Sequence, residues 1–487
     1  MKADILWVAG GRLVAALATL VAIRVATTLL EPNEYGLFTV LATFQMFCGL
    51  FLVNPVGQYI NRHTHEWGDD GTLYARLARF RSYVLVVAAM GALTAGVWAE
   101  MRPPLSSSQP LGYMLVVFFM VVAATWNATY VVLLNMFGLR ASSVLWGTGT
   151  VVLGLMASSA LVLVFGGGLS WFAGQAAGMA LGAIGARRIL FKSRPKPAIM
   201  PLKPLLEAGA LRHYVVPLAV ATGFMWCLVS GYRLVIDWHW GLAALGTLAV
   251  GFTLSTQLWG LAESLGMQYL FPLYYRRIAK ADKKEGAQAF SDLLNTLGPV
   301  YVVLAAAILP SAAALLKVFV SAQYANVVLF LQWGALFEFC RVAGNLLGSA
   351  AQVERRMNVL ILPYLAGSAV LIVGLLALRQ SNAQIEDAAA LVATSGAVML
   401  VVMGSLMRWR LPYRFDPGRW GFAGMVLVCS VAIVYRLDFA VQNIQEALLH
   451  VAVVGVFSLL CLVALLWKNP ALRQLMAVRL SDSAQSN

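Results

Sequence analysis

Fourteen stretches of about 20 mainly apolar residues follow one another along the whole chain. They lie at 5–30, 35–61, 80–101, 111–137, 143–165, 169–190, 212–236, 241–274, 293–316, 325–351, 357–378, 387–407, 420–436 and 446–467. A helix needs about 20 such residues to cross the hydrocarbon layer of a bilayer, which is about 30 Å thick. β-barrel strands would instead give segments of about 10 residues that alternate in polarity, and these runs do not alternate. The sequence therefore predicts an all-α, polytopic membrane protein with fourteen spanning helices.

The composition excludes a water-soluble protein. Apolar residues make up 60% of the 487 residues and charged residues only 11%, whereas about 25% of an average soluble chain is charged. So few charges cannot hydrate the surface of a soluble globule of this size, which excludes soluble enzymes, disordered chains and disulfide scaffolds. The five cysteines all lie inside apolar runs, where we expect packed thiols and not disulfides or metal ligands. The first apolar run follows Lys2, lacks a small-residue cleavage site and is too long for a signal peptide, so we expect it to be the first span.

The basic residues indicate how the spans are oriented. If the N-terminus is cytoplasmic, 27 of the 35 Lys and Arg residues fall on the cytoplasmic side. The external segments hold only Arg102, Lys317, Arg379 and Arg436. A miscounted helix would invert this bias from that point onward, and no inversion occurs. The net charge of +14 therefore reflects membrane topology and not nucleic acid binding. We predict a multi-pass protein of a bacterial inner membrane with both termini in the cytoplasm.

The chain divides into two similar blocks. We predict a six-helix lobe at 1–190, a basic cytoplasmic linker at 191–211, a second six-helix lobe at 212–410, and two further helices with a cytoplasmic tail at 411–487. A short echo supports a duplicated unit: Arg24 precedes the Gly36 of Tyr-Gly-Leu-Phe by 12 residues, and Arg233 precedes the Gly246 of Leu-Gly-Thr-Leu by 13. Two membrane lobes with a binding site between them are the usual layout of a secondary transporter that works by alternating access.

Six charged side chains lie inside the predicted spans. They are Arg12, Arg24, Arg233, Arg341, Glu263 and Glu338. A charge facing lipid costs at least about 2.5–3.5 kcal/mol at the bilayer centre, so such residues usually face water or one another. Two simpler explanations remain open. Arg24 and Arg233 are near the outer helix ends, where their side chains could reach the interface, and Glu338 and Arg341 could form a local ion pair.

Polar residues accompany these charges in three stripes. On the helix expected at 325–351 the stripe is Glu338, Arg341, Asn345, Ser349 and Gln352. On the helix expected at 241–274 it is Thr253, Thr256, Gly260, Glu263 and Met267 or Gln268, and a shorter one is Asn54, Gln58 and Asn61 beside Pro55. Such stripes can bind helices to one another, but acidic residues and an Arg among them favour a hydrated lumen. Four Arg and two Glu would leave that lumen with two positive charges, which suits an anionic group such as a diphosphate.

These considerations define the candidate site. For substrate binding we select Arg12, Arg24, Arg233, Arg341, Asn345 and Gln257. For ion coupling we select Glu263 and Glu338, which could bind H⁺ or Na⁺. We expect no catalytic residue, metal site or cofactor, and no nucleotide-binding motif indicates ATP as a driver.

The segment from Arg24 to Phe38 carries a family resemblance. It reads Arg-Val-Ala-Thr-Thr-Leu-Leu-Glu-Pro-Asn-Glu-Tyr-Gly-Leu-Phe and resembles the opening of the polysaccharide-biosynthesis flippases of the multidrug/oligosaccharidyl-lipid/polysaccharide (MOP) exporter superfamily. The resemblance implies a MATE-like V of two six-helix lobes that moves undecaprenyl-diphosphate-linked sugars. It also implies that Arg residues of a central cavity hold the anionic headgroup. The chain has Val25 after Arg24, so a site with an ion pair within the first helix would not transfer.

We therefore predict a secondary-active flippase for O-antigen or exopolysaccharide repeat units and not an enzyme. Its expected partners are a polyprenyl-diphosphate-linked glycan and membrane lipid, with polysaccharide polymerases and glycosyltransferases as candidate protein partners. A multidrug exporter of the same fold is the nearest alternative, and it would require a net acidic lumen. A membrane polysaccharide polymerase or ligase is a further alternative, but the longest external segment, at 102–110, is short for a catalytic site.

Overall fold

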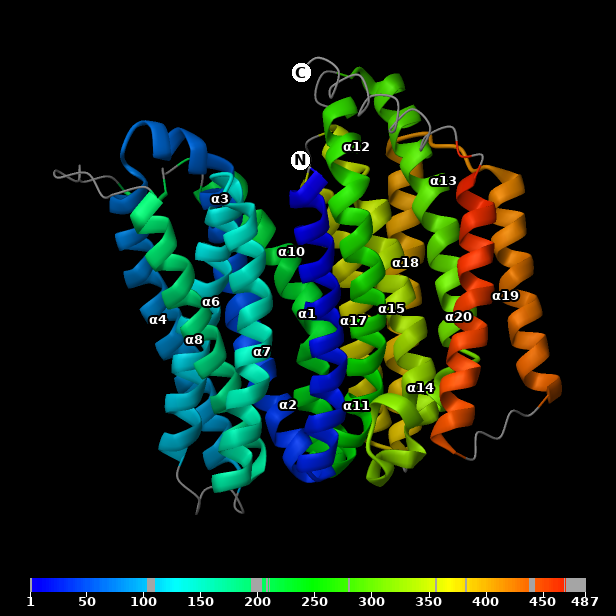
Figure 1. Ribbon diagram of the computed structural model, residues 1–487, viewed down its shortest axis with the longest axis horizontal. Coiled ribbons are helices and arrows are strands. Elements are labelled where there is room, and N and C mark those ends of the chain that lie inside the picture. The colour runs from blue at the N-terminus through cyan, green and yellow to red at the C-terminus, as the bar shows by residue number, and fades with distance from the viewer. Residues whose placement is uncertain are drawn as a thin grey trace. The chain divides into compact units, whose positions relative to one another are not determined.

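The computed structural model describes residues 2–102, 110–193, 204–206, 209, 211–278, 281–354, 357–381, 383–437, 443–467 and 469. All regular elements in these ranges are helical (Figure 1), which confirms the predicted all-α class. The first half holds α1 (Lys2–Leu29), α2 (Pro32–Phe47), α3 (Asn54–Asp69), α4 (Leu73–Glu100), α6 (Pro110–Met136), α7 (Arg140–Phe165), α8 (Gly167–Ser193), α10 (Val216–Trp226) and α11 (Tyr232–Tyr269). The second half holds α12 (Phe271–Ile278), α13 (Lys283–Ile308), α14 (Ala312–Phe319), α15 (Val328–Gly348), α16 (Ala351–Glu354), α17 (Ile361–Leu378), α18 (Ile385–Arg410), α19 (Pro417–Leu437) and α20 (Ile444–Trp467).

Many of these helices have the length and apolar composition of membrane-spanning segments. Over the described ranges, nine helical stretches are long and apolar enough to do so, and the longest, Leu211–Met267, contains two of the predicted spans. Lipid offers no hydrogen-bond partners to the backbone, so a spanning segment must satisfy its own N–H and C=O groups, as a helix does. The protein is therefore a multi-pass membrane protein.

Several predicted spans are bent at identifiable positions. A π turn at Cys48–Val53 joins α2 to α3 directly before Pro55, whose nitrogen cannot donate to the helix. A second break lies at Gly241, where φ is 83° and ψ is 173°, a conformation that suits glycine because it has no Cβ. This break separates the spans expected at 212–236 and 241–274. Pro272 does not kink the second of these spans, because α11 ends at Tyr269 and Pro272 begins the separate helix α12.

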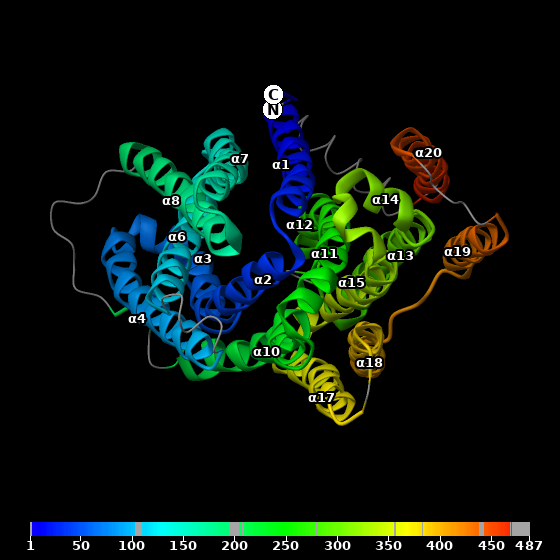
Figure 2. The same cartoon turned by 90° about the horizontal axis from the view of Figure 1, so that it is seen from below.

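The contacts divide the chain into two compact units, Met1–Ala249 (unit 1) and Val250–Asn487 (unit 2). The division falls inside α11, later than the predicted linker at 191–211. Positions 194–203 of that linker lie outside the described residues, and the predicted lobe boundaries stay a prediction. Within unit 1, α7 packs against α1 and α8, and α6 packs against α4 and α8 (Figure 2). Gly174 and Gly178 of α8 bring its backbone directly against Ser158 and Gly154 of α7, as small residues do between membrane helices.

The two glycines of the repeated sequence meet at a helix crossing. A Cβ on Gly36 would collide with the backbone carbonyl of Leu242, and a Cβ on Gly246 would collide with the carbonyl of Pro32. At the same place, the Glu34 carboxylate accepts a 2.7 Å hydrogen bond from the N–H of Gly168 at the beginning of α8. An acidic group there also balances the partial positive charge of the helix N-terminus. The segment that carries the family resemblance is therefore largely a packing motif, in which Gly36 and Glu34 hold α2 against α11 and α8.

Unit 2 is organised around α13, α15 and α18. Helix α15 packs against α13 and α18, and α17 packs against α18 (Figure 2). The two C-terminal helices α19 and α20 are held on α13 by an apolar cluster that includes Val303, Ala306, Ala423 and Cys461. Most of the large side chains along α20 are exposed, as expected for a helix that faces acyl chains.

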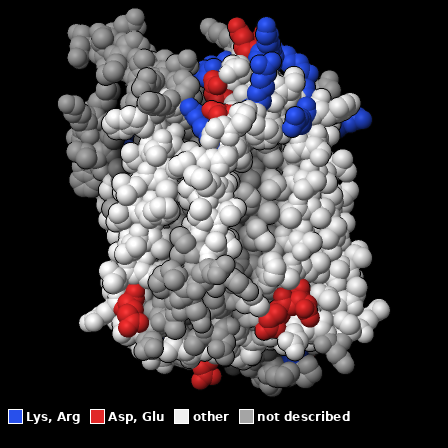
Figure 3. Space-filling view, turned by 90° about the vertical axis from the view of Figure 1, so that its right-hand side faces the viewer, with Lys and Arg blue, Asp and Glu red and all other residues white. Residues whose placement is uncertain are grey.

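Charges gather at opposite ends of unit 2. Figure 3 shows most Lys and Arg side chains at one end together with some acidic ones, further acidic side chains at the other end, and neither along the broad middle of the same face. Helix α18 follows this pattern, since it begins with Glu386 and Asp387 and ends with Arg408 and Arg410. The pattern agrees with the orientation predicted from the basic loops, in which the Arg-rich end faces the cytoplasm.

The topology can be checked with two single cysteines in a background without native cysteines. We expect Ser381→Cys, between α17 and α18, to react with a membrane-impermeant maleimide in intact cells. Lys284→Cys, at the start of α13, should react only after the membrane is permeabilised. The opposite labelling pattern would contradict the predicted orientation of unit 2.

The glycine crossing predicts a selective loss of stability. We expect Gly36→Ala to lower the free energy of unfolding by about 1–3 kcal/mol, because the new Cβ overlaps the Leu242 backbone. Gly57→Ala is the matched control, since no atom lies near the position of its Cβ and alanine favours a helix by about 1 kcal/mol. Thermal unfolding of the purified protein in detergent measures both variants. An equal Tm for Gly36→Ala and Gly57→Ala would show that the crossing is not tight.

Candidate transport site

Arg341 on α15 lies between two carboxylates. Its Nε donates to Oε2 of Glu338 at 2.7 Å, and one of its terminal nitrogens donates to Oε2 of Glu263 at 2.9 Å. Glu338 is one turn before Arg341 on the same helix, so this contact is the local ion pair that the sequence left open. Glu263 comes from α11, and the sequence had no means of showing that it joins the same pair.

Polar side chains extend this ion pair into a network. The hydroxyl of Thr256 donates to Oε1 of Glu338 at 2.9 Å, and the amide of Asn345 donates to Oε1 of Glu263 at 2.8 Å. The hydroxyl of Tyr364 on α17 in turn donates to the Asn345 carbonyl at 3.1 Å. All four carboxylate oxygens therefore have a donor, which is what stabilises charges that are removed from water.

The network forms because two of the predicted stripes face each other. Thr256 and Glu263 belong to the stripe on α11, and Glu338, Arg341 and Asn345 belong to the stripe on α15. Direct hydrogen bonds between helices, the simpler explanation for such stripes, are thus present in unit 2. The α15 stripe is shorter than predicted, since the helix ends at Gly348 and Gln352 lies in α16.

The charge of this network differs from the sequence-based count. Two carboxylates meet one guanidinium, so the network carries a formal charge of −1 when all three groups are ionised. Exposure also differs among its members: the side chain of Glu338 is 3% exposed, that of Arg341 13% and that of Glu263 24%. Glu263 is consequently the carboxylate of this network that is most accessible from outside. The excess of positive charge expected for the lumen is not found among these three residues.

The other selected arginines belong to unit 1. Arg24 is half-buried on α1, and Arg233 is half-buried at the beginning of α11. The Nε of Arg233 is buried and makes no hydrogen bond to any residue that the structure describes. A buried N–H without an acceptor costs about 1–3 kcal/mol. The side chain of Arg12 lies outside the described part of α1.

A buried carboxylate next to Arg233 was not selected from the sequence. Asp237 is one turn further along α11 and fully buried, and its Oδ2 accepts hydrogen bonds from Trp98 at 3.0 Å and from Arg102 at 2.6 Å. Both donors come from the end of α4. The sequence placed Arg102 and Asp237 in separate external loops. Only the i, i+4 relation of Asp237 to Arg233 could have drawn attention to Asp237. Only Oδ2 of Asp237 is engaged by these donors, and its buried Oδ1, like the Nε of Arg233, has no hydrogen-bond partner among the described residues.

Two further predicted positions stand apart from the network. Gln257 is half-buried on α11 next to Thr256, and the hydrogen bonds described above do not include it. Within the third stripe, Gln58 donates to Asn54 on its own helix at 3.2 Å. Over the described residues, no group of three His, Cys, Asp or Glu side chains converges to hold a metal ion.

The ion network predicts strong coupling between its members. We expect Arg341→Met to lower the free energy of unfolding by about 3–5 kcal/mol, because it leaves the buried Glu338 carboxylate without its cation. The combined variant Arg341→Met/Glu338→Gln should recover part of this loss, since it removes the uncompensated charge as well.

Thermal unfolding of the four proteins of this double-mutant cycle measures the coupling, and Gln257→Ala serves as the control on α11. Strictly additive effects of Arg341→Met and Glu338→Gln would contradict the network.

Comparisons with known proteins show which solved structures share this fold. No model of a protein family and no curated protein matched the sequence. Among solved structures, the lipid II flippase MurJ in an inward closed conformation is similar over 95% of this chain and 98% of its own, with 9% identity and a TM-score of 0.65. An inward-facing multidrug resistance MATE family transporter of the MOP superfamily is similar over 82% of this chain and 94% of its own, with 12% identity and a TM-score of 0.56. The eukaryotic MATE transporter AtDTX14 matches over 88% of this chain and 98% of its own, with 11% identity and a TM-score of 0.54. The chain therefore has the fold of the MOP-type transporters, the group to which the resemblance of residues 24–38 had pointed.

Proposed function

We propose that the protein is a flippase that moves a polyprenyl-diphosphate-linked oligosaccharide from the inner to the outer leaflet of a bacterial inner membrane by alternating access. The observation that carries this proposal is the extent of the match to the lipid II flippase, which covers 95% of this chain and 98% of that one. The two MATE structures leave more of the chain unmatched, at 82% and 88% coverage. The substrate would be an O-antigen or exopolysaccharide repeat unit.

The diphosphate of such a substrate needs cationic hydrogen-bond donors. Arg233 supports this role, because its buried Nε has no acceptor among the described residues while the nearby Asp237 is engaged by Arg102. Arg24 is the corresponding residue of the first repeat and is also half-buried. A guanidinium binds phosphate oxygens through two parallel hydrogen bonds, which a lysine cannot reproduce. We assign headgroup binding to Arg24 and Arg233, with Arg12 as a third candidate on α1.

Protons are the better candidate for the coupling ion than Na⁺. A sodium ion would have to bind among the oxygens of Glu263 and Glu338, which the positively charged Arg341 already occupies. A proton can instead be added to Glu263, the more exposed of the two carboxylates, without displacing the guanidinium from Glu338. Protonation would change the formal charge of the network from −1 to zero.

The same protonation would change what Arg341 can bind. The terminal nitrogen that donates to Glu263 would lose its charged acceptor, while the Nε would stay with Glu338. Arg341 could then offer one donor to a phosphate oxygen, with Asn345 one turn further along α15. Proton uptake and headgroup binding would thus use the same side chain.

A multidrug exporter is the second candidate, and one observation favours it. The network of unit 2 holds more carboxylates than guanidinium groups, which would attract a cationic drug and not an anionic lipid. The two candidates differ in their prediction for Glu263: neutralising it should abolish drug export outright, whereas a flippase should retain downhill movement of its lipid.

Loss of the unit 1 arginines should stop polymer export. In cells that lack the native transporter, we expect Arg24→Ala and Arg233→Ala to lower surface polysaccharide about 10- to 100-fold, because each removes charge-assisted hydrogen bonds of about 1.5–3 kcal/mol. Arg212→Ala is the control, because Arg212 is an exposed arginine of the same unit in the π turn Leu211–Val215. Immunoblots of membrane fractions report whether each variant is inserted. Wild-type polysaccharide levels in both Arg24→Ala and Arg233→Ala would refute their role.

Coupling can be tested separately from binding. In proteoliposomes that contain a fluorescent polyprenyl-diphosphate oligosaccharide, we expect an imposed pH gradient to accelerate flipping by the wild-type protein. Glu263→Gln should flip at a rate that no longer responds to the gradient, because residue 263 then stays neutral. Full gradient dependence in Glu263→Gln, or dependence on a Na⁺ gradient alone, would contradict proton coupling at this residue.

A further inference from the structure

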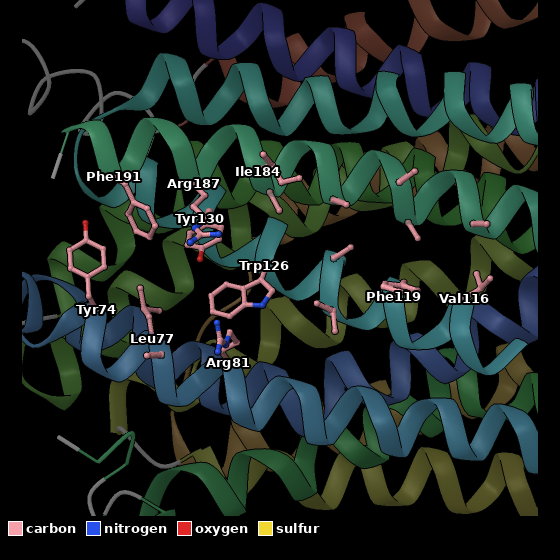
Figure 4. Close-up of a pocket in the computed structure, with 18 residues that line it drawn as sticks. Tyr74, Leu77, Arg81, Val116, Phe119, Trp126, Tyr130, Ile184, Arg187 and Phe191 are labelled. Carbon is pink, nitrogen blue, oxygen red and sulfur yellow. The ribbon is translucent and has the colours of Figure 1, made fainter. Parts of the chain in front are cut away.

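Unit 1 contains a cavity of about 620 Å³ between α4, α6 and α8 (Figure 4). Its wall on α8 consists of small side chains, among them Ala176, Ala180 and Ala183, and its wall on α6 carries the larger Phe119 and Trp126. The alanines leave space that the side chains of α4 and α6 do not fill. The lining of this space is mainly apolar along most of its length. This cavity belongs neither to the ion network of unit 2 nor to the surroundings of Arg233.

One end of the cavity is cationic. Arg81 of α4 and Arg187 of α8 line it, and Figure 4 shows them reaching toward Trp126 and Tyr130 of α6 from opposite sides. Both guanidinium groups lie within electrostatic reach of the Tyr130 hydroxyl. Within the described residues neither arginine is paired with a carboxylate, and Arg187 instead lies over the ring of Phe191 at 5.1 Å. Two unpaired cations therefore face one end of an apolar cavity.

The dimensions of the cavity correspond to one leaflet of a bilayer. From Val116 to Tyr130 its α6 wall covers 15 residues, or about 21 Å at 1.5 Å per residue, which is enough to span half of a hydrocarbon layer, about 15 Å. Phe119 and Ile184, which both line the cavity, are 60% and 48% exposed, so acyl chains outside the protein can reach it. By the predicted topology, the arginine end lies at the cytoplasmic surface.

We propose that this cavity, the α4–α6–α8 cavity, binds an anionic phospholipid of the inner leaflet, with one acyl chain along the alanine wall and the phosphate between Arg81 and Arg187. The two arginines complement the negative charge of a phosphate, and the apolar part of the cavity is long enough for an acyl chain. A soluble anion would leave the apolar part unfilled, and a cationic amphiphile would be repelled by the two guanidinium groups. The site is independent of the proposed flippase activity, since none of its residues has a role in that proposal.

Bound lipid would fill the space between three helices of unit 1. Helix α6 packs against both α4 and α8, and an acyl chain in the cavity would fill the space that the alanines of α8 leave open. The protein would then be more stable in membranes that contain anionic lipid. This dependence is measurable on the purified protein without any transport substrate.

The test is a binding titration on the full-length protein in detergent, with brominated phosphatidylglycerol as the probe and brominated phosphatidylethanolamine as the zwitterionic comparison. Bromine quenches tryptophan fluorescence at contact, and Trp126 lies inside the cavity. We expect saturable quenching by phosphatidylglycerol, and we expect Trp126→Phe to remove that saturable component. Quenching that is equal for the two lipids, or unchanged in Trp126→Phe, would overturn the proposal.

Substitutions separate the charged end from the apolar wall. A basic residue near the membrane surface contributes to anionic lipid binding by roughly a factor of five, so we expect Arg81→Ala and Arg187→Ala each to weaken binding about fivefold and the pair about 25-fold. Arg188→Ala is the control, because Arg188 is exposed next to Arg187 but does not line the cavity. Ala180→Phe fills the apolar part without changing charge and should also abolish saturable binding. Unchanged affinity in the double arginine variant or in Ala180→Phe would refute the site.

A competition experiment identifies the class of lipid. We expect unlabelled phosphatidylglycerol to displace the brominated probe, and inorganic phosphate to have no effect because it lacks the acyl chain. A polyprenyl diphosphate should compete no better than phosphatidylglycerol. Stronger competition by the polyprenyl diphosphate would show that the cavity receives the transported lipid and would overturn the assignment to a bilayer phospholipid.

Discussion

A lipid environment offers no hydrogen bonds and little screening, and this constraint governs both the backbone and the buried charges of the protein. Helices satisfy the backbone, and the bends at Cys48–Val53 and Gly241 occur where a proline follows or where glycine permits a positive φ. Charges need partners of their own. Arg341 is the clearest case. It binds Glu338 on its own helix and Glu263 on α11, and so it joins the two helices.

The intramembrane arginines of the two units differ in their partners. In unit 2, Arg341 is neutralised by carboxylates, and the whole network changes charge when one proton is added to Glu263. In unit 1, Arg102 binds Oδ2 of Asp237, while a buried nitrogen of Arg233 has no acceptor among the described residues. In the proposed function, the arginines of unit 1 would hold the anionic headgroup and the network of unit 2 would respond to protons. This difference in partners also explains why a count of charges along the sequence cannot describe the electrostatics of the site.

The resemblance and the structure agree on the fold but assign different roles to the same residues. In the segment from Arg24 to Phe38, Gly36 permits the close crossing with α11 and Glu34 holds the beginning of α8. Such residues are restricted by packing, whatever the protein transports. A short motif of this kind therefore indicates the architecture of MOP-type transporters more directly than it indicates a substrate.

The sequence by itself determined the class of fold and the many apolar helices, because these depend on local apolar length. It also indicated that Glu338 and Arg341 could pair, since residues three apart on a helix are neighbours. Only the tertiary structure decided that Glu263 shares Arg341, that Asp237 is occupied by Arg102, and that Gly36 and Gly246 form one crossing. Each of these contacts joins residues far apart in the chain, and the polar stripes of a helix show which face is polar without showing which helix that face meets.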